Sequence, residues 1–390
     1  MAHRPMAEAR ARHHVAMLVR NPYTHDSRVE KEVRTLVADG HRVSIVADAA
    51  PGLPARESRD GSEIHRVERR GPAIPGLRFA VHEWRLARRL GALRPTVLHA
   101  HDTNALVPVA LAARALGVRY VYDAHDLWLG RPRRGRGRLY FALSQLYHRI
   151  VERLLVPRAA ATLTVSPPIV GHLRRRYGLP VVHLAPNYPE LGRPVERREL
   201  RELPGGDAID ATRPVVLYLG GLMGGRGLEQ LVDAIGLVPE VQLVMLGSGA
   251  EEEPLRKRAA KRGASVILLA PVTPELVEPY AASADVGVSP IVPSCLNYRY
   301  SLPNKLFQYM AAGIPVVASD FPQVREVVEG SGCGVVVDTT RPKAIADGIR
   351  RVLADRSEAI GMGARGRAAV EDRYNWEVSA AVLRTVYETA

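Results

Sequence analysis

Short apolar runs alternate with amphipathic segments along this chain, and this alternation restricts its fold more than any other feature. After the first run, Val29, Val33 and Leu36 share one face of a helix that ends at Gly40, a residue typical of helix C-termini. Strands that alternate with helices in this way predict a parallel sheet with helices on both faces. The apolar runs of the N-terminal half are residues 15–19, 43–47, 96–101, 120–125 and 162–166.

A second alternation of the same kind fills the C-terminal half. The stretch before it, 196–211, mixes charges with Pro and Gly without sustained periodicity, so we predict an interdomain linker there. Two doubly wound α/β domains are therefore expected, 1–195 and 212–374. Ligands bind at the carboxyl ends of the strands in such sheets, so two facing sheets would hold a ligand in the cleft between them. The apolar runs of this half are residues 215–220, 241–247, 265–271, 286–290 and 315–319.

Length and cysteine content agree with two domains in a reducing compartment. The 390 residues exceed the roughly 250–300 residues at which a single core usually stops growing. Cys295 and Cys333 are too few for a disulfide framework and lack the spacing of a zinc site, which favours the cytoplasm. No apolar run has the length of a signal peptide or of a membrane span, so we expect neither secretion nor a spanning helix.

The net charge of +13 is distributed unevenly. Residues 1–200 hold 34 of the 54 Lys and Arg but only 18 of the 41 Asp and Glu. A basic half suits an anionic acceptor, a membrane surface or a nucleic acid. Aromatic residues make up only 5% of the chain and no nucleic-acid-binding motif occurs, so we expect no nucleic acid partner.

An arginine run at 131–138 precedes a segment in which apolar residues recur at helical spacing. Stripes of this kind usually pack into a core, and we interpret this one as core. Two interpretations of the arginine run stay open: a solvated loop, or a surface that holds an anionic acceptor or makes peripheral contact with an anionic membrane. The residues of the stripe are Leu139, Leu143, Leu146, Ile150 and Leu154.

The strand at 215–220 runs into a glycine cluster and then into a helix expected to start near Arg226. Glycines let the backbone approach a ligand closely, and a helix N-terminus presents unsatisfied amides, so this turn suits a pyrophosphate. Glycine also serves tight strand-to-helix turns that bind nothing. The local pattern alone leaves phosphate contact and simple loop geometry equally open.

A second helix start follows Pro303 and carries Lys305 in its first turn. Cations normally prefer the C-terminal end of a helix, so a lysine beside the positive end of the dipole indicates an anion nearby. The alternative is a solvated lysine.

Taken together, these segments resemble the retaining glycosyltransferases of the GT-B fold, known as glycosyl transferases group 1 or family 4. The resemblance rests on DSRVEKEVRTLVADGHRVSIV, VLHAHD, YDAHDLW, YLGGLMGGRGLEQLVDAI, MLGSGAEEEPLRK and PNKLFQYMAAGIPVVAS, in this order. It implies two Rossmann-like doubly wound parallel-sheet domains that face each other across a cleft. It also implies that the closing segment, 375–390, is a helix that packs back on the N-terminal domain.

The resemblance implies a donor site in the C-terminal domain and a metal-independent reaction without a cofactor. Arg226 and Lys305 would stabilise the departing diphosphate of a UDP- or GDP-sugar, whose oxygen takes the acceptor proton. Gly221 stands where the family usually has an arginine, and Tyr300 and Gln308 stand where it has two glutamates. Gln308 can still bond a ribose hydroxyl through its amide. The donor-binding residues expected from the resemblance are Gly220, Gly221, Gly247, Val272, Tyr300, Pro303, Asn304, Lys305, Leu306 and Gln308.

In the N-terminal domain, the resemblance makes His125 the catalytic histidine that touches the donor sugar; a purely structural histidine is the alternative. His99 and His101 alternate on one strand and so point to one face, but without a third ligand at fitting spacing we expect no metal site. Asn21, Asp26 and His101 are expected on the acceptor side. Asp26 serves equally well as the N-cap of the helix that follows.

The sequence therefore predicts a retaining glycosyltransferase that moves a sugar from a nucleoside diphosphate to an acceptor, either a small specialised metabolite with a hydroxyl or thiol, or a glycan. Two alternatives stay open. One is a transferase at the membrane surface acting on a lipid-linked or polysaccharide acceptor, and the other is a sugar-nucleotide-binding protein of this shape without turnover. A homodimer also stays open.

Overall fold

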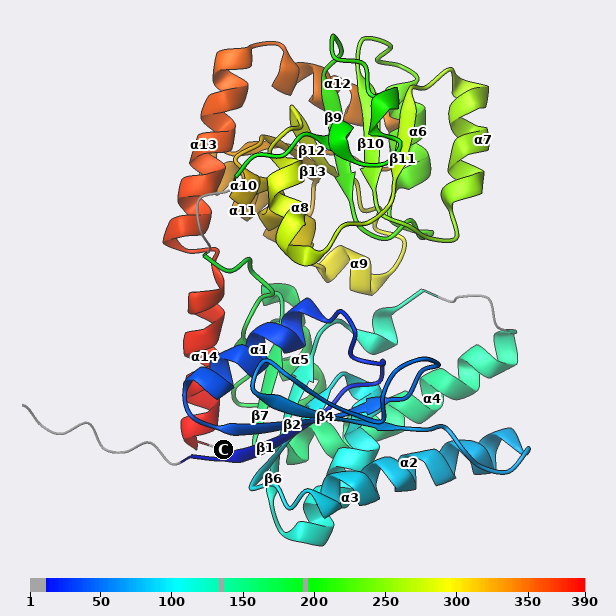
Figure 1. The fold of residues 1–390 in the computed structure, drawn as a ribbon, viewed down its shortest axis with the longest axis vertical. Helices are drawn as coiled ribbons and strands as arrows, with labels where there is room; N and C mark the ends of the chain where they lie inside the picture. The colour runs from blue at the N-terminus through cyan, green and yellow to red at the C-terminus, as the bar shows by residue number, and fades with distance from the viewer. Residues whose placement is uncertain (1–11, 133–136, 192–195, 390) are drawn as a thin grey trace, which may run out of the picture. The chain divides into compact units, whose positions relative to one another are not determined.

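The computed structural model describes residues 12–132, 137–191 and 196–389, and the chain divides into two compact units. The first comprises Met1–Leu129, Arg133–Ala185 and Ser379–Ala390, and the second comprises Gly130–Pro132 and Pro186–Val378. The boundaries therefore fall at 185 and 378, where the sequence suggested 195 and 374. Each unit is built around one sheet (Figure 1).

The sheet of the first unit has the order β3-β4-β2-β1-β5-β6-β7-β8, parallel except for the antiparallel β3–β4 pair. Its strands are β1 (His14–Leu18), β2 (Arg42–Asp48), β3 (Arg56–Arg59), β4 (Ser62–Val67), β5 (Val97–His101), β6 (Arg119–Ala124), β7 (Ala161–Thr164) and β8 (His183–Leu184). The sequence did not indicate β3, β4 or β8. β3 alternates only between exposed and half-buried positions, and β8 has two residues, so neither carries an apolar signal.

Helices cover both faces of this sheet, as the alternation predicts (Figure 1). α1 (Ser27–Ala38) and the C-terminal α14 (Trp376–Thr389) lie on one face, where Val33 and Leu383 share a core with Val15 and Ile45. α2 (Pro75–Ala92) and α3 (Leu106–Leu116) lie on the opposite face. α4 (Arg138–Leu155) and α5 (Pro167–Tyr177) complete the unit.

The sheet of the second unit has the order β11-β10-β9-β12-β13-β14, and its neighbouring strands pair in parallel. Its strands are β9 (Val215–Leu219), β10 (Gln242–Leu246), β11 (Val266–Leu269), β12 (Val286–Ser289), β13 (Val316–Ser319) and β14 (Gly334–Val337). The predicted strands therefore all exist, and β14 is an addition.

The second sheet is buried on both faces because its strands are continuous apolar runs. Along β9, Leu217 and Leu219 face one core, whereas Val216 and Tyr218 face the other. The helices of this unit are α6 (Leu228–Ile235), α7 (Glu252–Arg262), α8 (Pro274–Ala281), α9 (Leu296–Tyr300), α10 (Asn304–Ala312), α11 (Pro322–Ser331), α12 (Pro342–Leu353) and α13 (Arg356–Asp372).

Two sequence interpretations are wrong. The stretch 196–211 is not a free linker, because it forms 3₁₀ turns at Leu200–Glu202 and Gly206–Ala208 that bury Leu200 and Ile209 in the second unit's core. The stripe on α4 is not core, because all five of its leucine and isoleucine side chains are exposed. Helical periodicity identifies an apolar face but does not say what covers it. Of the arginine run before this helix, residues 133–136 lie outside the described residues.

Candidate active site

Glycines shape the turn at the carboxyl end of β9. Gly220 has φ +109°, and a Cβ there would lie 3.8 Å from the Lys305 ammonium. A Cβ on Gly225 would lie 2.7 Å from the Tyr298 ring, and one on Gly227 would lie 1.7 Å from the Pro290 carbonyl oxygen. Gly225 and Gly227 are therefore required by packing in the loop, so part of the glycine pattern reflects loop geometry. Gly221 has no such restriction on its φ, and its nearest neighbour is the flexible Met223.

Two cations meet beside this turn. Lys305 is only 7% exposed, and its Nζ lies 3.5 Å from the centre of the Tyr218 ring. The Arg226 guanidinium lies over the Tyr298 ring at 5.5 Å, and its Nε is buried without a hydrogen-bond partner. Burial and the charge of Arg226 hold the pKa of Lys305 well below its usual range. Among the described residues neither cation pairs with a carboxylate, so the protein itself does not balance the positive charge at this turn.

The structure fixes the N-terminus of α10 through a residue that the sequence did not single out. The Tyr309 hydroxyl accepts a hydrogen bond from the Leu219 amide at 2.9 Å and lies 3.2 and 3.1 Å from the carbonyl oxygens of Leu217 and Val288. Its ring occupies the space left by Gly287, where a Cβ would lie 2.3 Å away. Tyr309 therefore ties α10, and with it Lys305, to β9 and β12.

A second positioning residue is Gln323 at the start of α11. Its amide donates to the carbonyl oxygens of Arg299 and Ser301, both at 2.8 Å, which holds the connection between α9 and α10. That connection carries Pro303, which precedes α10 as its N-cap. Nothing in the local sequence distinguishes Gln323 from a surface residue of a helix, so only the fold reveals its role.

The other predicted donor residues differ in how far their side chains are exposed to solvent. Asn304 is exposed at the start of α10, and Gln308 is half-buried one turn later. Tyr300 ends α9 and is also half-buried. The side chain of Leu306 is fully buried in the core, so only its backbone can reach a ligand.

Two further donor residues lie in loops after neighbouring strands. Gly247 follows β10, and a Cβ there would lie 2.1 Å from the Gly220 carbonyl oxygen, so the two strand ends touch through backbone. Val272 follows β11, is half-buried and packs on the core. Gly247 therefore supports the shape of the turn, whereas Val272 packs on the core and retains an exposed part.

In the first unit, an ionic cluster lies at the carboxyl ends of β5 and β6. Arg28 of α1 donates through Nε and Nη2 to the two carboxylate oxygens of Asp123, at 2.8 and 2.9 Å. His125 Nε2 lies 3.2 Å from Asp123 Oδ2, and the His125 amide donates to Asp102. Burial disfavours the charge of His125, but Asp123 and Asp102 outweigh it and raise its pKa to about 9. His125 is therefore an imidazolium at neutral pH.

His99 and His101 do share one face, with ring centres 4.2 Å apart. The expectation that no third ligand approaches them is wrong, because Glu32 and Asp123 bring oxygens to the same place, and one ligand atom from each of the four residues falls within 4.8 Å of the others. The sequence missed this because Glu32 and Asp123 come from α1 and β6.

Arg28 argues against a metal in this cluster. Its guanidinium already holds both oxygens of Asp123 and lies 3.1 Å from Glu32 Oε1, so a divalent ion would have to enter beside a fixed positive charge. Burial, and then the nearby Asp123, raise the pKa of Glu32 well above its usual range, which makes it a poorer anionic ligand for a metal. The residues fit a cluster paired with Arg28 better than a metal site.

The predicted acceptor residues are placed differently from one another. Asp26 caps α1, because its carboxylate accepts from the Val29 amide at 3.3 Å, and it also accepts from Asn21 Nδ2 at 2.9 Å. The N-cap interpretation of Asp26 is therefore confirmed. His101 is buried, with Nδ1 3.0 Å from His125 Nε2, so its side chain supports His125 and is not available to an acceptor.

Two family models match the chain. The model described as Glycosyltransferase Family 4 matches residues 27–188, and the model described as Glycosyl transferases group 1 matches residues 213–355. The chain belongs to the GT-B glycosyltransferases.

Relatives and solved structures agree with this assignment. The glycosyltransferase is 27% identical over 348 residues to the alpha-D-kanosaminyltransferase of Streptomyces kanamyceticus, an alignment that covers 84% of this chain and 83% of that protein. Sucrose-phosphate synthase from Thermosynechococcus elongatus matches with a TM-score of 0.79 at 21% identity, over 96% of this chain and 98% of that one. HepE of Anabaena, solved in complex with UDP-glucose, matches with a TM-score of 0.72 at 15% identity, over 97% and 99%. The family and the GT-B fold predicted from the sequence are confirmed.

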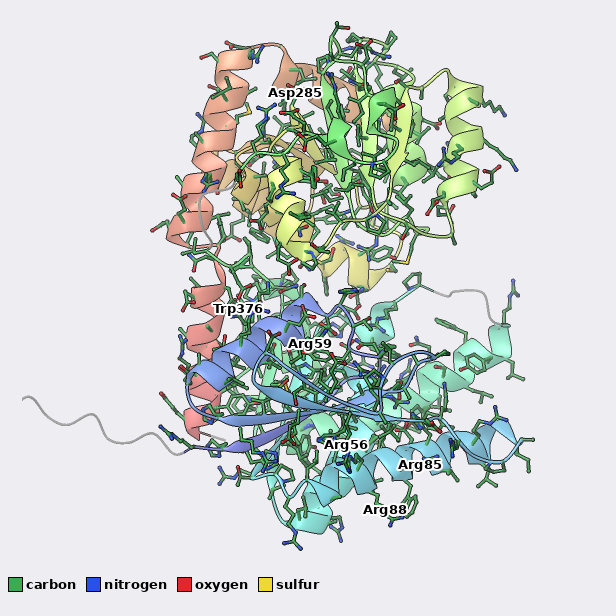
Figure 2. The ribbon with its side chains drawn as sticks, in the orientation of Figure 1. Arg56, Arg59, Arg85, Arg88, Asp285 and Trp376 are labelled. Carbon is green, nitrogen blue, oxygen red and sulfur yellow. The ribbon has the colours of Figure 1, made fainter. Side chains whose placement is uncertain are left out.

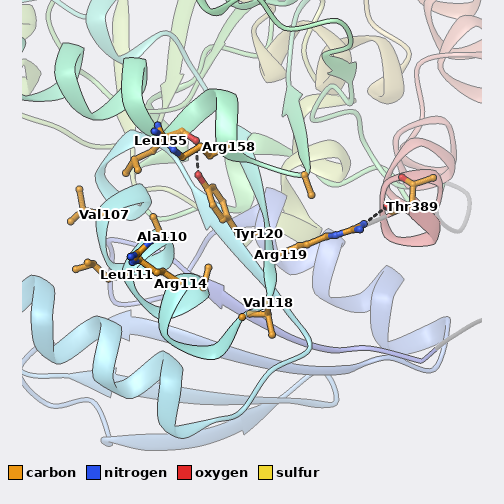
Figure 3. Close-up of a pocket in the computed structure, with 13 residues that line it drawn as sticks. Val107, Ala110, Leu111, Arg114, Val118, Arg119, Tyr120, Leu155, Arg158 and Thr389 are labelled. Atoms are coloured by element: carbon orange, nitrogen blue, oxygen red, sulfur yellow. Dashed lines mark hydrogen bonds between the residues drawn. The ribbon is translucent and has the colours of Figure 1, made fainter.

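Two large cavities of the glycosyltransferase lie away from these residues. One of about 850 Å³ sits at the amino end of β6, lined by Tyr120, Leu155 and Arg158 among others (Figure 3). Another of about 570 Å³ lies beside α2, where Arg56, Arg85 and Arg88 gather (Figure 2). The first lies at an amino strand end, and the second borders the end of β4 in the first unit; neither is lined by a predicted donor residue, so we assign neither to the donor.

Proposed function

We propose that this glycosyltransferase transfers a sugar from a nucleoside diphosphate sugar, UDP- or GDP-linked, with retention of the anomeric configuration and without a metal. The observation that carries the proposal is the pair Arg226 and Lys305, two largely buried cations beside a glycine turn with no carboxylate partner among the described residues. A diphosphate supplies the missing negative charge. The similarity in fold to HepE, which was solved with UDP-glucose, supports a nucleotide sugar as donor.

The chemistry follows from where charge develops. When the bond from the anomeric carbon to the diphosphate oxygen breaks, negative charge accumulates on the leaving oxygens. Arg226 and Lys305 stabilise that charge through preorganised contacts. The acceptor hydroxyl or thiol gives its proton to the leaving phosphate oxygen as it bonds to the same carbon, so no separate base and no metal are required.

In the first unit, His125 carries a further positive charge. Asp123 orients its ring, and Arg28 in turn fixes Asp123. We assign His125 to the transferred sugar, and its replacement by Ala should therefore lower turnover without changing the affinity for free UDP or GDP. His125→Asn separates the two contributions of the imidazolium, because an amide retains hydrogen bonding but carries no charge. If the charge matters, turnover of His125→Asn should also be low.

Thermal unfolding with UDP, GDP and buffer alone tests the donor site. A diphosphate at about 100 times its Kd adds about 2.7 kcal/mol to the unfolding free energy. Arg226→Ala should abolish most of that gain and reduce turnover roughly 100-fold. Lys261→Ala, at an exposed lysine of α7, is the matched control. Equal stabilisation of the wild type and Arg226→Ala by the preferred nucleotide would refute the proposed site.

The identity of the acceptor is the second part of the proposal. We propose a small metabolite with a hydroxyl or thiol, or a glycan, supported by the activity named for the kanosaminyltransferase relative. A second candidate, transfer at a membrane surface, is favoured by the exposed apolar face of α4. Either transferase should release free nucleoside diphosphate only when an acceptor is added, whereas a binding protein without turnover should release none.

A further inference from the structure

α4 in the first unit is attached by its polar face and exposes its apolar face. On the inner side, Glu152 accepts hydrogen bonds from Thr103, at 2.6 Å, and from Tyr177, and the His148 ring packs on Trp128 with centroids 4.8 Å apart. A helix on a sheet normally buries its apolar side, so this orientation is the reverse of the usual one.

The outer face is a continuous apolar stripe. At about 100° per residue, positions 139, 143, 146, 150 and 154 fall within an arc of about 80° on the side opposite the buried residues. Exposure ranges from 50% for Ile150 and Leu154 to 73% for Leu139. Single exposed leucines are ordinary, but a row of them along a whole helix marks an interaction surface.

Positive charge borders this stripe. Arg138, Arg149 and Arg153 lie along one edge of it at helical spacing, and none is paired with an acid among the described residues. The sole acidic residue of α4 is Glu152, which is buried and hydrogen-bonded on the inner side. The outer face of α4 is therefore apolar and basic, without a compensating carboxylate of its own.

α2 also carries exposed apolar and basic side chains. It contacts α4 where the Phe79 and Tyr147 rings meet edge to face at 5.7 Å. Leu77 and Trp84 of α2 are also exposed, and Arg88 lies over the Trp84 ring at 5.4 Å. Its one acid, Glu83, is buried against Arg20.

We propose that the outer face of α4, together with α2, binds the surface of an anionic lipid bilayer, with α4 lying in the plane of the interface. The leucine and isoleucine side chains enter the boundary between headgroups and acyl chains, and the arginines contact lipid phosphates. Across the described part of the chain, no helix combines the length and the apolar character needed to cross a membrane.

Charge selects the bilayer over a second copy of this chain. In a two-fold symmetric dimer the same patch meets itself, which would bring the arginines of both copies together without acids between them. An anionic bilayer supplies the complementary charge and, beneath it, the apolar layer. The proposal concerns where the enzyme resides and does not depend on the identity of its donor.

Co-sedimentation with vesicles tests the surface. The full chain should sediment with vesicles of phosphatidylcholine and phosphatidylglycerol in equal parts, less as salt rises, and poorly with phosphatidylcholine alone. Leu143→Gln/Ile150→Gln should weaken binding about tenfold or more, because two inserted side chains are lost. Arg149→Gln/Arg153→Gln should remove mainly the preference for anionic lipid.

Ile360→Gln, on α13 of the second unit, is the matched control, because Ile360 is 64% exposed and lies on another helix. It should bind vesicles as the wild type does. All substituted side chains are exposed, so the melting temperature in solution should not change. Binding of Leu143→Gln/Ile150→Gln at the wild-type level would overturn the proposal. The proposal would also be overturned if the wild type is a dimer in analytical ultracentrifugation, Leu143→Gln/Ile150→Gln is a monomer, and neither protein sediments with vesicles.

Discussion

Replacing Lys305 with Met should stabilise the protein and weaken donor binding at once. The Lys305 ammonium is almost fully buried and lies against the face of the Tyr218 ring, at 3.5 Å. A cation–π contact returns about 0.5–2 kcal/mol, whereas burying an ammonium costs several kcal/mol. Burial and Arg226 lower the pKa of Lys305, as expected if burying the ammonium costs more than the cation–π contact returns.

The expected magnitudes follow. Met is similar in length and needs no solvation, so the unfolding free energy should rise by about 1–4 kcal/mol. For a unit of this size each kcal/mol raises Tm by about 2–4 °C. A charge-assisted hydrogen bond to phosphate is worth about 1.5–3 kcal/mol, so the Kd for UDP or GDP should rise roughly 10- to 150-fold.

Calorimetry adds a second measurement. A bound diphosphate opposes the lowering of the Lys305 pKa, so donor binding by the wild type should be coupled to proton uptake in a pH series, seen as a heat that depends on the ionisation enthalpy of the buffer. Lys305→Met should lose that dependence. Lys261→Met, at an exposed lysine, should change neither stability nor binding. A variant that melts at a lower temperature yet binds the nucleotide normally would mean that Lys305 is structural, and the reasoning would be wrong.

Three further predictions concern the turn, the helix and the buried cluster. Gly221→Arg restores the basic residue usual in the family at a position where a Cβ would meet only the flexible Met223 side chain, at 3.3 Å, so UDP or GDP should bind more tightly in a fluorescence titration. Gly225→Ala, whose Cβ would lie 2.7 Å from Tyr298, should instead lower Tm. The reverse pattern would contradict the geometry. Gln308→Ala should cost on the order of 1 kcal/mol of donor affinity while Gln308→Glu keeps or improves it; calorimetry that finds all three proteins alike would place the side chain elsewhere. Burial and Asp123 raise the pKa of Glu32 in the folded protein, so stability should fall as pH rises above the pKa of an unfolded glutamate, and Glu32→Gln should remove that fall in urea titrations across pH. Asp123→Asn, which removes the carboxylate that both Nε and Nη2 of buried Arg28 contact, should instead cost about 3–5 kcal/mol at neutral pH, and two equally mild variants would refute this account of the cluster.

Much of the fold and of the donor site could be predicted from the sequence, because both depend on local patterns. Buried parallel strands are apolar runs, and a helix that starts after Pro303 places Lys305 in its first turn whatever surrounds it. The glycine turn with Arg226 and the helix start with Lys305 could therefore be located from the sequence, whereas their role as a phosphate site rests on the family resemblance. The edge strand β3 could not be located, since exposed strands carry no apolar signal.

Contacts between distant segments could not be predicted in this way. Arg28 and Asp123 are 95 residues apart in the sequence, and Tyr309 reaches strands that precede it by 90 residues in one case. No local pattern records such pairs, because either partner alone is only an arginine, an aspartate or a tyrosine on an element of the expected type. The ionic cluster around His125 is for this reason a product of tertiary structure.

The sequence by itself determined the two sheets, the glycine turn after β9 with Arg226, and the position of Lys305 at a helix start, because each follows from periodicity or from the chemistry of consecutive residues. Only the tertiary structure decided that Glu32 and Asp123 join the histidines of β5, and that the leucines of α4 face outward. The physical reason is the same in both cases. A pattern of residues establishes that a side chain prefers an apolar or a charged neighbour, but the packing of elements far apart in the chain determines which neighbour it has.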